Sequence, residues 1–427
     1  MNKTELTTGI YTISDFRIVK EKMLNWANQF SIFCFLDNHN YQIAPHSVEC
    51  MLAAGVKRCI ECKAGNALTQ LQQFIDERTA WIFGHLGYDL KNEIEQLTSS
   101  NPDGIEFPDL YFFEPEILIR LNEKEMQIEA NDADAVFESI LNTPLNAGKN
   151  FDKLTIEGRV GKDEYINIVN RVKQHILRGD CYELNFCQEF YAAHAVIDPV
   201  DVYKKLSIVS PNPFSALYKL NSKWLICASP ERYIKRQGDT ILSQPIKGTS
   251  KRNTDQTADA KQKDDLFHSA KDRSENVMVV DLVRNDLAKV CREGTVEVNE
   301  LYGVYSFPQV HQMISTISGE LKEAISFKEI IEATFPMGSM TGAPKKRVME
   351  LIEQYEKTKR GIFSGAVGYI NPVADFDFNV VIRSILYNAE KKYLSFPAGS
   401  GITFYSDAEK EWEECLMKAE AIRQILE

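Results

Sequence analysis

Two pairs of carboxylates in this sequence have the spacing of one helical face. Asp272 and Glu275 are three residues apart near the start of one helical pattern, and Glu411 and Glu414 are three residues apart in the last one. Because residues at this spacing lie on the same side of a helix, each pair would present its oxygens together. Two facing pairs would form an all-oxygen site for Mg²⁺, which prefers carboxylates together with an anionic substrate. The alternative is an ordinary solvated helix face.

A lysine and a glutamate each follow an apolar, strand-like run. Lys247 lies in QPIKGT (244–249), and Glu231 ends the segment SPE (229–231). A lysine acts as a nucleophile only where its pKa is lowered from about 10.4 toward neutrality. A carboxylic acid with a raised pKa could protonate a leaving hydroxyl group. On residue chemistry alone, a surface lysine and a turn residue at a strand end remain the simpler interpretations.

Three glycine-rich segments and one arginine could bind an anion. The segments are FPMGSMTGAPK (335–345), SGAVGY (364–369) and PAGSGI (397–402), and Arg383 lies in the strand-like run NVVIRSIL. Glycine lets backbone N–H groups approach an anion closely, and an arginine among β-branched residues needs a partner such as a carboxylate. None of the segments matches a phosphate-binding loop or a dinucleotide fingerprint, so nucleotide binding is not predicted.

Apolar periodicity predicts the elements that must position these side chains. The predicted strands come in groups and do not alternate with helices, which favours an α+β fold with large antiparallel sheets and helices on the outside. Helical patterns cover 14–28, 67–79, 162–178, 274–290, 341–355 and 407–426. Strand-like runs cover 31–36, 110–121, 181–192, 214–220, 224–228, 240–246, 362–370, 378–387 and 393–397. The polar stretch 251–274 is either an irregular excursion or the solvated start of a helix.

Composition limits the compartment, the partners and the domain count. A length of 427 residues predicts two or three domains or one interleaved body, and the polar stretch 143–153 is the best boundary between regions 1–150 and 151–427. The net charge of −12 argues against nucleic acid and membrane surfaces as partners. No apolar run is long enough to span a membrane. Nine cysteines without a framework predict a reducing, cytoplasmic compartment.

The ordered motifs from about residue 155 to the C-terminus resemble the chorismate-utilising enzymes. This family includes the large subunits of anthranilate synthase and aminodeoxychorismate synthase, and the isochorismate and salicylate synthases. The region 1–150 resembles the family only loosely. The motifs are GDCYELNFCQEF (179–190), ASPERY (228–233), QPIKGT (244–249), SENVMVVDLVRNDL (274–287), SGEL (318–321), GSMTGAPKKRVMELI (338–352), RGIFSGAVGYI (360–370), VIRS (381–384), AGSGI (398–402) and the C-terminal glutamate helix. The resemblance implies two large antiparallel sheets packed together, with outer helices.

The resemblance also implies a site for chorismate and Mg²⁺. Glu275 and Glu414 would bind the metal, while Asp272 and Glu411 would hold water or orient those ligands. Glu231 would be the acid that protonates the departing C4 hydroxyl group. The substrate would be held by Arg383, Tyr369, Gly399, Ser400, Gly401, Gly248, Thr249 and Lys418.

Two positions predict which reaction of the family this chain performs. Lys247 stands where anthranilate synthases carry alanine, and a lysine there is similar to the aminodeoxychorismate synthases, which serve 4-aminobenzoate and folate synthesis. The amine would attack C2 as the C4 hydroxyl leaves, and ammonia would then attack C4 and expel the lysine. Glu183 stands where isochorismate and salicylate enzymes carry a water-activating lysine, which disfavours water addition. The alternatives are an anthranilate synthase and a non-catalytic, chorismate-binding regulatory subunit.

Three features depart from the family pattern or are missing. Glu183 is usually glutamine in amino-transferring members, so its charge requires either protonation or a cation such as Lys247 beside it. Gln312 occupies the place of a histidine, so either the preceding His311 takes over its proton transfer or that role is dispensable. No Gly-x-Cys-x-Gly nucleophile elbow occurs, so ammonia would come from solution or from a separate glutamine amidotransferase subunit.

Overall fold

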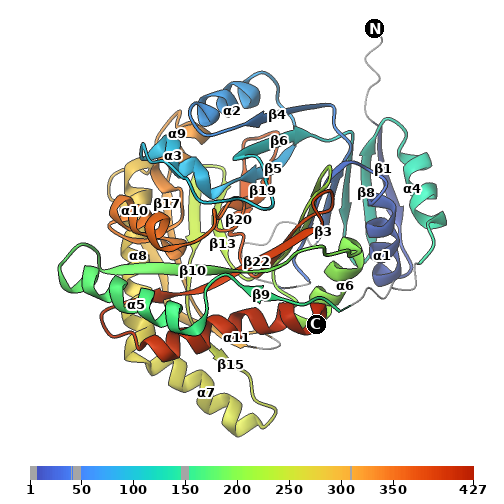
Figure 1. The fold of residues 1–427 in the computed structure, drawn as a ribbon. Helices are drawn as coiled ribbons and strands as arrows, with labels where there is room; N and C mark the ends of the chain where they lie inside the picture. The colour runs from blue at the N-terminus through green and yellow to red at the C-terminus, as the bar shows by residue number, and fades with distance from the viewer. Residues whose placement is uncertain (1–6, 40, 42–49, 146–152, 308–309) are drawn as a thin grey trace.

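The computed structural model describes residues 7–39, 41, 50–145, 153–307 and 310–427 (Figure 1). Within these residues the chain forms two large antiparallel sheets flanked by 11 α-helices. The predicted α+β class is therefore confirmed. The predicted boundary at 150/151 lies outside the described residues.

The larger sheet has 12 strands in the described part of the chain, and the pairing of β2 with β11 joins strands from the N-terminal 150 residues to later ones. In spatial order these strands are β1 (Thr7–Thr12), β8 (Glu125–Ala130), β7 (Ile117–Leu121), β3 (Cys50–Ala54), β2 (Ile32–Asp37), β11 (Phe214–Leu220), β12 (Lys223–Ser229), β21 (Ser384–Asn388), β22 (Tyr393–Ile402), β10 (Glu183–Ala192) and β18 (Gly342–Ala343), with β9 (Glu157–Gly158) beside β10.

The second sheet has 10 strands among the described residues and also mixes early and late segments. In spatial order these strands are β15 (Ile246–Lys251), β17 (Val310–Glu320), β14 (Thr240–Gln244), β13 (Arg232–Gln237), β20 (Phe376–Asn379), β19 (Ala366–Ile370), β5 (Ile82–Leu86), β6 (Leu110–Glu114) and β4 (Arg58–Cys62), with β16 (Glu297–Ser306) beside β17.

The helices lie on the outside of the sheets, as predicted (Figure 1). They are α1 (Phe16–Ala27), α2 (Ala67–Asp76), α3 (Lys91–Ile94), α4 (Ala133–Asn142), α5 (Lys162–Leu177), α6 (Pro199–Val209), α7 (Gln256–His268), α8 (Ala270–Val290), α9 (Phe327–Thr334), α10 (Lys345–Tyr355) and α11 (Ala408–Leu426), with short 3₁₀ turns η1 (Tyr88–Leu90) and η2 (Gly338–Met340). Helices α5 and α11 run beneath β10 and β22 and so border the chemistry-bearing part of the chain.

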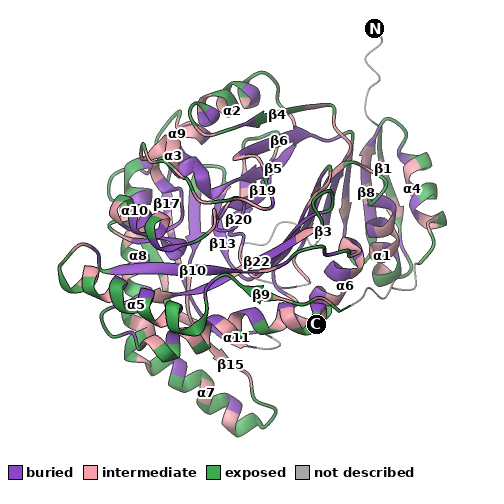
Figure 2. Ribbon diagram, in the orientation of Figure 1, coloured by how far each residue is buried: buried purple, intermediate pink, exposed green. Residues whose placement is uncertain are grey.

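The larger sheet is buried on both faces. Along β2, Cys34 belongs to the apolar cluster between the sheets, while Phe33 and Phe35 belong to a second cluster that includes residues of α1, α5, α6 and α11. Because successive side chains of a strand point to opposite faces, burial of both faces explains why residues 32–36 are continuously apolar. Figure 2 shows that the strands of the sheets are mainly buried, whereas α7 is largely exposed.

Two of the predicted strands each correspond to two strands in the structure, one in each sheet. The run 110–121 divides into β6 and β7, and the run 378–387 overlaps β20 and β21. Pro115 separates β6 from β7, and proline has no N–H group for a sheet ladder. The chain thus crosses from one sheet to the other at both places.

The polar stretch 251–274 is mostly helical. It contains all of α7 and the first turn of α8, which begins at Ala270 rather than at the predicted residue 274. Ser269 caps α8 by accepting a hydrogen bond from the backbone N–H of Asp272 at 3.2 Å. This earlier start places Lys271 and Asp272 on the helix that also carries Glu275.

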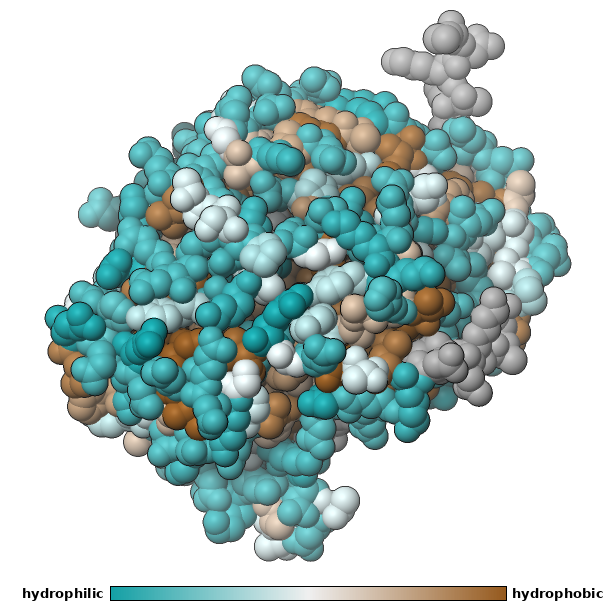
Figure 3. Space-filling view, in the orientation of Figure 1, coloured by the Kyte–Doolittle hydropathy of each residue, from teal (hydrophilic) through white to brown (hydrophobic). Residues whose placement is uncertain are grey.

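The surface of the molecule is mainly polar on the face shown in Figure 3, where hydrophobic residues form small separate areas. None of the helices in the described residues has the length and apolar character that a membrane crossing requires.

Candidate active site

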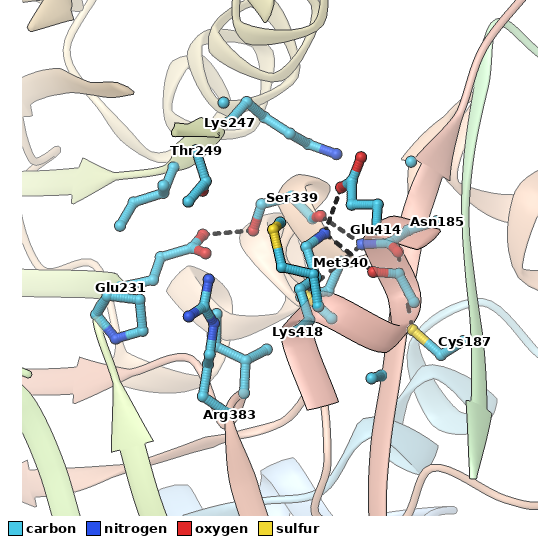
Figure 4. Close-up of a pocket in the computed structure, with 18 of the residues that line it drawn as sticks. Asn185, Cys187, Glu231, Lys247, Thr249, Ser339, Met340, Arg383, Glu414 and Lys418 are labelled. Atoms are coloured by element: carbon cyan, nitrogen blue, oxygen red, sulfur yellow. Dashed lines mark hydrogen bonds and ion pairs between the residues drawn. The ribbon is translucent and has the colours of Figure 1, made fainter. Parts of the chain in front are cut away.

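A cavity of about 610 Å³ lies where β10 and β22 of the larger sheet and β15 and β17 of the second sheet meet α8 and α11. Its wall carries several polar and charged side chains, and those of Lys247, Glu231, Arg383 and Glu414 face a shared space (Figure 4). The predicted site residues that line it are Glu231, Lys247, Gly248, Thr249, Asp272, Glu275, Arg383, Gly399, Gly401, Glu414 and Lys418. Residues far apart in the sequence therefore converge here, in one concave site of ligand-binding size.

Three predicted site residues do not line this cavity. Tyr369 packs its ring against Trp81 and Phe83, with centroids 5.5 and 5.9 Å away. Ser400 lies on β22 between Gly399 and Gly401, and its hydroxyl group is 3.5 Å from the hydroxyl of Tyr165 on the opposite side of the strand. Glu411 is buried and does not line the cavity, and its Oε1 accepts a hydrogen bond from Lys271, which does.

Glu231 lies just after β12, where its surroundings favour the neutral form of its carboxyl group. Its side chain is buried, and Oε1 accepts a hydrogen bond of 2.5 Å from Oγ of Ser339 (Figure 4). Burial raises the pKa of this carboxyl group to about 7, although the serine partly opposes the shift. A carboxyl group with this pKa can carry a proton near neutral pH and donate it to a leaving group.

Lys247 extends from β15 into the cavity and forms an ion pair with Glu183, the first residue of β10. The structure thus confirms that the charge of Glu183 has a cation beside it. Burial lowers the pKa of the Lys247 amine, but the charge of Glu183 and then that of Glu275 outweigh this effect and raise it above its usual value. Lys247 is therefore a charged ammonium group in this arrangement.

The carboxylates predicted to bind a metal lie around a lysine ammonium group. Nζ of Lys271 is 3.3 Å from Oε1 of Glu411 and 3.8 Å from Oε1 of Glu275. Burial raises the pKa of Glu275 to about 7. Oε1 of Glu275 and Oε2 of Glu411 are buried without hydrogen-bond partners. In the described part of the chain, no three His, Cys, Asp or Glu side chains are close enough together to hold a metal ion.

Arg383 lies in the segment that crosses from β20 to β21, and not in a strand as predicted. Its φ angle of 51° is in the left-handed region, which is uncommon for arginine and costs free energy. No hydrogen bond or ion pair of its guanidinium group is formed within the described residues. Burial lowers the pKa of Arg383, and only the charge of Glu414 opposes the shift. A strained, unpaired arginine in a cavity is suited to an anionic ligand.

Lys418 and Glu414 form an i,i+4 ion pair of 2.7 Å on α11. Burial raises the pKa of Glu414, but Lys418 lowers it below its usual value. Nζ of Lys418 also donates a hydrogen bond of 3.0 Å to the carbonyl oxygen of Gly399. A Cβ atom at Gly399 would lie 1.9 Å from the carbonyl oxygen of Phe186, so the close pairing of β10 and β22 requires glycine here.

Gln312, and not His311, faces the cavity. Gln312 lines the wall, and its Oε1 atom is buried without a hydrogen-bond partner. His311 points toward α7, where its Nδ1 is 2.9 Å from Oγ of Ser306 and its Nε2 is 3.1 Å from Oδ1 of Asp259. His311 does not line the cavity, which disfavours the alternative that it takes over the proton transfer.

Sequence reasoning did not identify several wall residues. Ser339, which holds Glu231, lies in the motif GSMTGAPK, but neither the glycines of this motif nor its family resemblance predicted a role for the serine. Lys271 and Phe363 line the wall beside residues that were predicted. No local pattern marks Ser339, because its partner is 108 residues away in the sequence.

Comparisons with known proteins place this architecture in one family. The family model described as chorismate binding enzyme matches residues 31–424. The chain is 34% identical over 349 residues to aminodeoxychorismate synthase component 1 of Salmonella typhimurium, covering 81% of this chain and 76% of the relative. It is 32% identical over 371 residues to the anthranilate synthase component I-like protein of Synechocystis sp., covering 85% of this chain and 76% of the relative.

A crystal structure has the same fold. Anthranilate synthase component I from Streptococcus pneumoniae superimposes with a TM-score of 0.77 at 24% identity, covering 90% of this chain and 94% of that chain. Because the family model spans most of the chain and includes every residue of the cavity wall, the chain belongs to the chorismate-binding enzymes.

Proposed function

We propose that this chain is the large subunit, component I, of an aminodeoxychorismate synthase, which converts chorismate and ammonia into 4-amino-4-deoxychorismate. The observation that carries the proposal is Lys247, whose amine enters the same cavity as the acid Glu231. Relatives named aminodeoxychorismate synthase component 1 at 31–34% identity support it. The product would serve the synthesis of 4-aminobenzoate and folate.

The proposed reaction uses two successive displacements. The neutral amine of Lys247 attacks C2 of the ring, and the double bonds shift so that the C4–O bond breaks. Glu231 protonates the departing hydroxyl group, which leaves as water. Ammonia then attacks C4, the double bonds shift back, and Lys247 leaves C2 as an amine. The two steps together retain the configuration at C4 and divide one difficult substitution into two easier ones. The ammonium group that forms at C4 then gives one proton to the Glu231 carboxylate, which restores the acid.

We propose that Glu275 and Glu414 bind Mg²⁺, with Asp272 and Glu411 as water-holding or orienting neighbours. The unpartnered oxygens of Glu275 and Glu411 fit this ion because Mg²⁺ prefers oxygen ligands. The bound metal would supply a fixed positive charge for the ring carboxylate of chorismate. For the set to assemble, the ammonium group of Lys271 must move away, and its side chain, which is 42% exposed, has a path to solvent.

Replacing Lys271 by methionine is expected to tighten Mg²⁺ binding about three- to tenfold, because a competing cation is removed from Glu275 and Glu411. Isothermal titration of the protein with MgCl₂, without chorismate, measures this affinity. Lys289→Met, on the same helix but paired with Asp286 at 3.1 Å, is the matched control. Unchanged or weaker Mg²⁺ binding by Lys271→Met would argue against these carboxylates as the metal site.

Replacing Arg383 by glutamine is expected to raise the KM for chorismate about 10- to 100-fold, because a charged hydrogen bond to a substrate carboxylate is lost. Steady-state kinetics measure this change, and Arg284→Gln, at an exposed site on α8, is the control. An unchanged KM in the Arg383 variant would remove this residue from substrate binding.

We further propose that ammonia comes from a separate glutamine amidotransferase subunit and that the enzyme acts in the cytoplasm. The sequence has no glutaminase nucleophile elbow, and the relatives' name "component 1" supports a partner subunit. All nine cysteines are free thiols, eight of them buried, which suits a reducing compartment.

Anthranilate synthase is the second candidate function, because the Synechocystis relative at 32% identity is named an anthranilate synthase component I-like protein. The purified chain incubated with chorismate, MgCl₂ and an ammonium salt distinguishes the two, with the products separated by mass. Aminodeoxychorismate retains the enolpyruvyl group, whereas anthranilate has lost it. Accumulation of anthranilate or isochorismate would refute the proposed function.

A further inference from the structure

The contact between Glu183 and Lys247 is buried and specific. Glu183 is 1% exposed and the side chain of Lys247 is 10% exposed, and the two come from different sheets. A Cβ atom at position 401 would lie 2.7 Å from Oε1 of Glu183 and 2.9 Å from Nζ of Lys247, so Gly401 leaves the space that the pair occupies. The pair is therefore built into the junction of β10, β15 and β22.

An ammonium group has no lone pair, so Lys247 must lose a proton before it can attack a carbon atom. The acids that face it are Glu183 from β10, Glu275 from α8 and Glu231 from the segment after β12, with Glu414 and the cations Lys271, Lys418 and Arg383 elsewhere on the wall. Glu231 must itself carry a proton in the proposed reaction, and Glu275 belongs to the carboxylates proposed for the metal. Among the described residues, Glu183 is the one acid in hydrogen-bond contact with the amine.

Glu183 also has an oxygen atom ready to accept that proton. Its Oε1 atom receives the hydrogen bond from Lys247, whereas Oε2 is buried and has no hydrogen-bond partner. Oε2 therefore has lone pairs that no hydrogen bond occupies among the described residues. A glutamine at the same position would preserve the contact but would have no means of accepting a proton.

We infer that Glu183 is the proton acceptor that turns Lys247 into a nucleophile. This inference rests on the proposed function. The proton moves from Nζ to the Glu183 carboxylate, the neutral amine forms the bond to C2, and water leaves C4 with the proton of Glu231. After ammonia expels Lys247 as a neutral amine, Glu183 returns the proton. Charge and protons on the pair are thereby restored at the end of each turnover.

The test is Glu183→Gln, measured as kcat and KM for chorismate across the neutral range. At about pH 7 we expect kcat to fall about 100-fold with little change in KM, as for loss of a proton acceptor. The ratio of wild-type to variant kcat should also fall about tenfold for each pH unit, because only the variant depends on bulk solvent to deprotonate Lys247. Glu189→Gln, which changes a buried acid on the same strand that pairs with Arg159, should show the wild-type profile.

Two results would overturn the inference while the proposed function stands. The first is a Glu183→Gln enzyme with wild-type kcat. The second is a loss of kcat that is the same at every pH, since this would mean that Glu183 only positions Lys247. Glu183→Asp, which keeps a carboxylate, should recover part of kcat and the wild-type pH dependence, and a failure to do so also counts against a proton acceptor. If instead the wild-type enzyme makes no aminodeoxychorismate, the proposed function itself fails.

Discussion

Replacing Lys247 by alanine is expected to abolish formation of 4-amino-4-deoxychorismate, with a loss of at least about 10³-fold in kcat. The nucleophile of the first displacement is removed, so no covalent adduct between the enzyme and the ring can form. Alanine is also the residue that anthranilate synthases carry at this position, so any residual product is expected to be anthranilate. Peptide mass spectrometry of enzyme quenched during turnover measures the adduct.

The matched control for this variant is Lys251→Ala, at the exposed last residue of the same strand. It should retain full activity and the adduct on Lys247. Thermal unfolding of Lys247→Ala should be recorded as well, because the substitution leaves the buried Glu183 without its cation. A folded Lys247→Ala enzyme with an unaltered product profile would remove this lysine from the mechanism.

Replacing Glu231 by glutamine is expected to lower kcat about 10²- to 10⁴-fold, because the departing C4 hydroxyl group loses its proton donor. The kcat of the wild-type enzyme should also depend on pH through the protonation of Glu231. Only the protonated carboxyl group can donate, and burial raises its pKa to about 7, so kcat should fall as the pH rises above this value. Rate measurements on both proteins across the neutral range test the assignment, and an identical falling limb in Glu231→Gln would contradict it.

The same substitution is expected to stabilise the fold. The pKa of Glu231 in the folded state lies above its ordinary value of 4.5, so its contribution to stability is greatest below that value and is lost as the pH rises through about 7. A neutral glutamine avoids this loss, and we expect the free energy of unfolding at about pH 8 to increase by about 1–3 kcal/mol. Urea unfolding measures this change. A more stable but inactive protein would show that lost activity does not reflect misfolding.

The sequence predicts most of the charged residues of the cavity wall because the chemistry lies in short motifs. Lys247 in QPIKGT, Glu231 in SPE and Arg383 in VIRS are recognisable without a structure, and all three line the cavity. The helical periods of α8 and α11 also place two carboxylate pairs correctly on helices. Such signals are local, because they depend on residue types and spacings within one element.

The sequence does not reveal features that depend on contacts between distant segments of the chain. Which sheet a strand joins depends on partners far along the chain, so the division of 110–121 and 378–387 between two sheets has no local signal. Tyr369 illustrates the consequence, since it lies in a recognised motif but faces Trp81 and Phe83, while Phe363 from the same motif lines the cavity. The placement of Lys271 between Glu275 and Glu411 likewise depends on how α8 meets α11.

The ring carbon that receives nitrogen tests the central claim most directly. The purified protein should be incubated with chorismate, MgCl₂ and ¹⁵N-labelled ammonium, and the product analysed by NMR. If Lys247 directs the chemistry as proposed, the label will be bonded to C4 in a ring that keeps its enolpyruvyl group. A label at C2 of an aromatic ring would contradict the account, because it would mean that ammonia attacks the position assigned to the lysine.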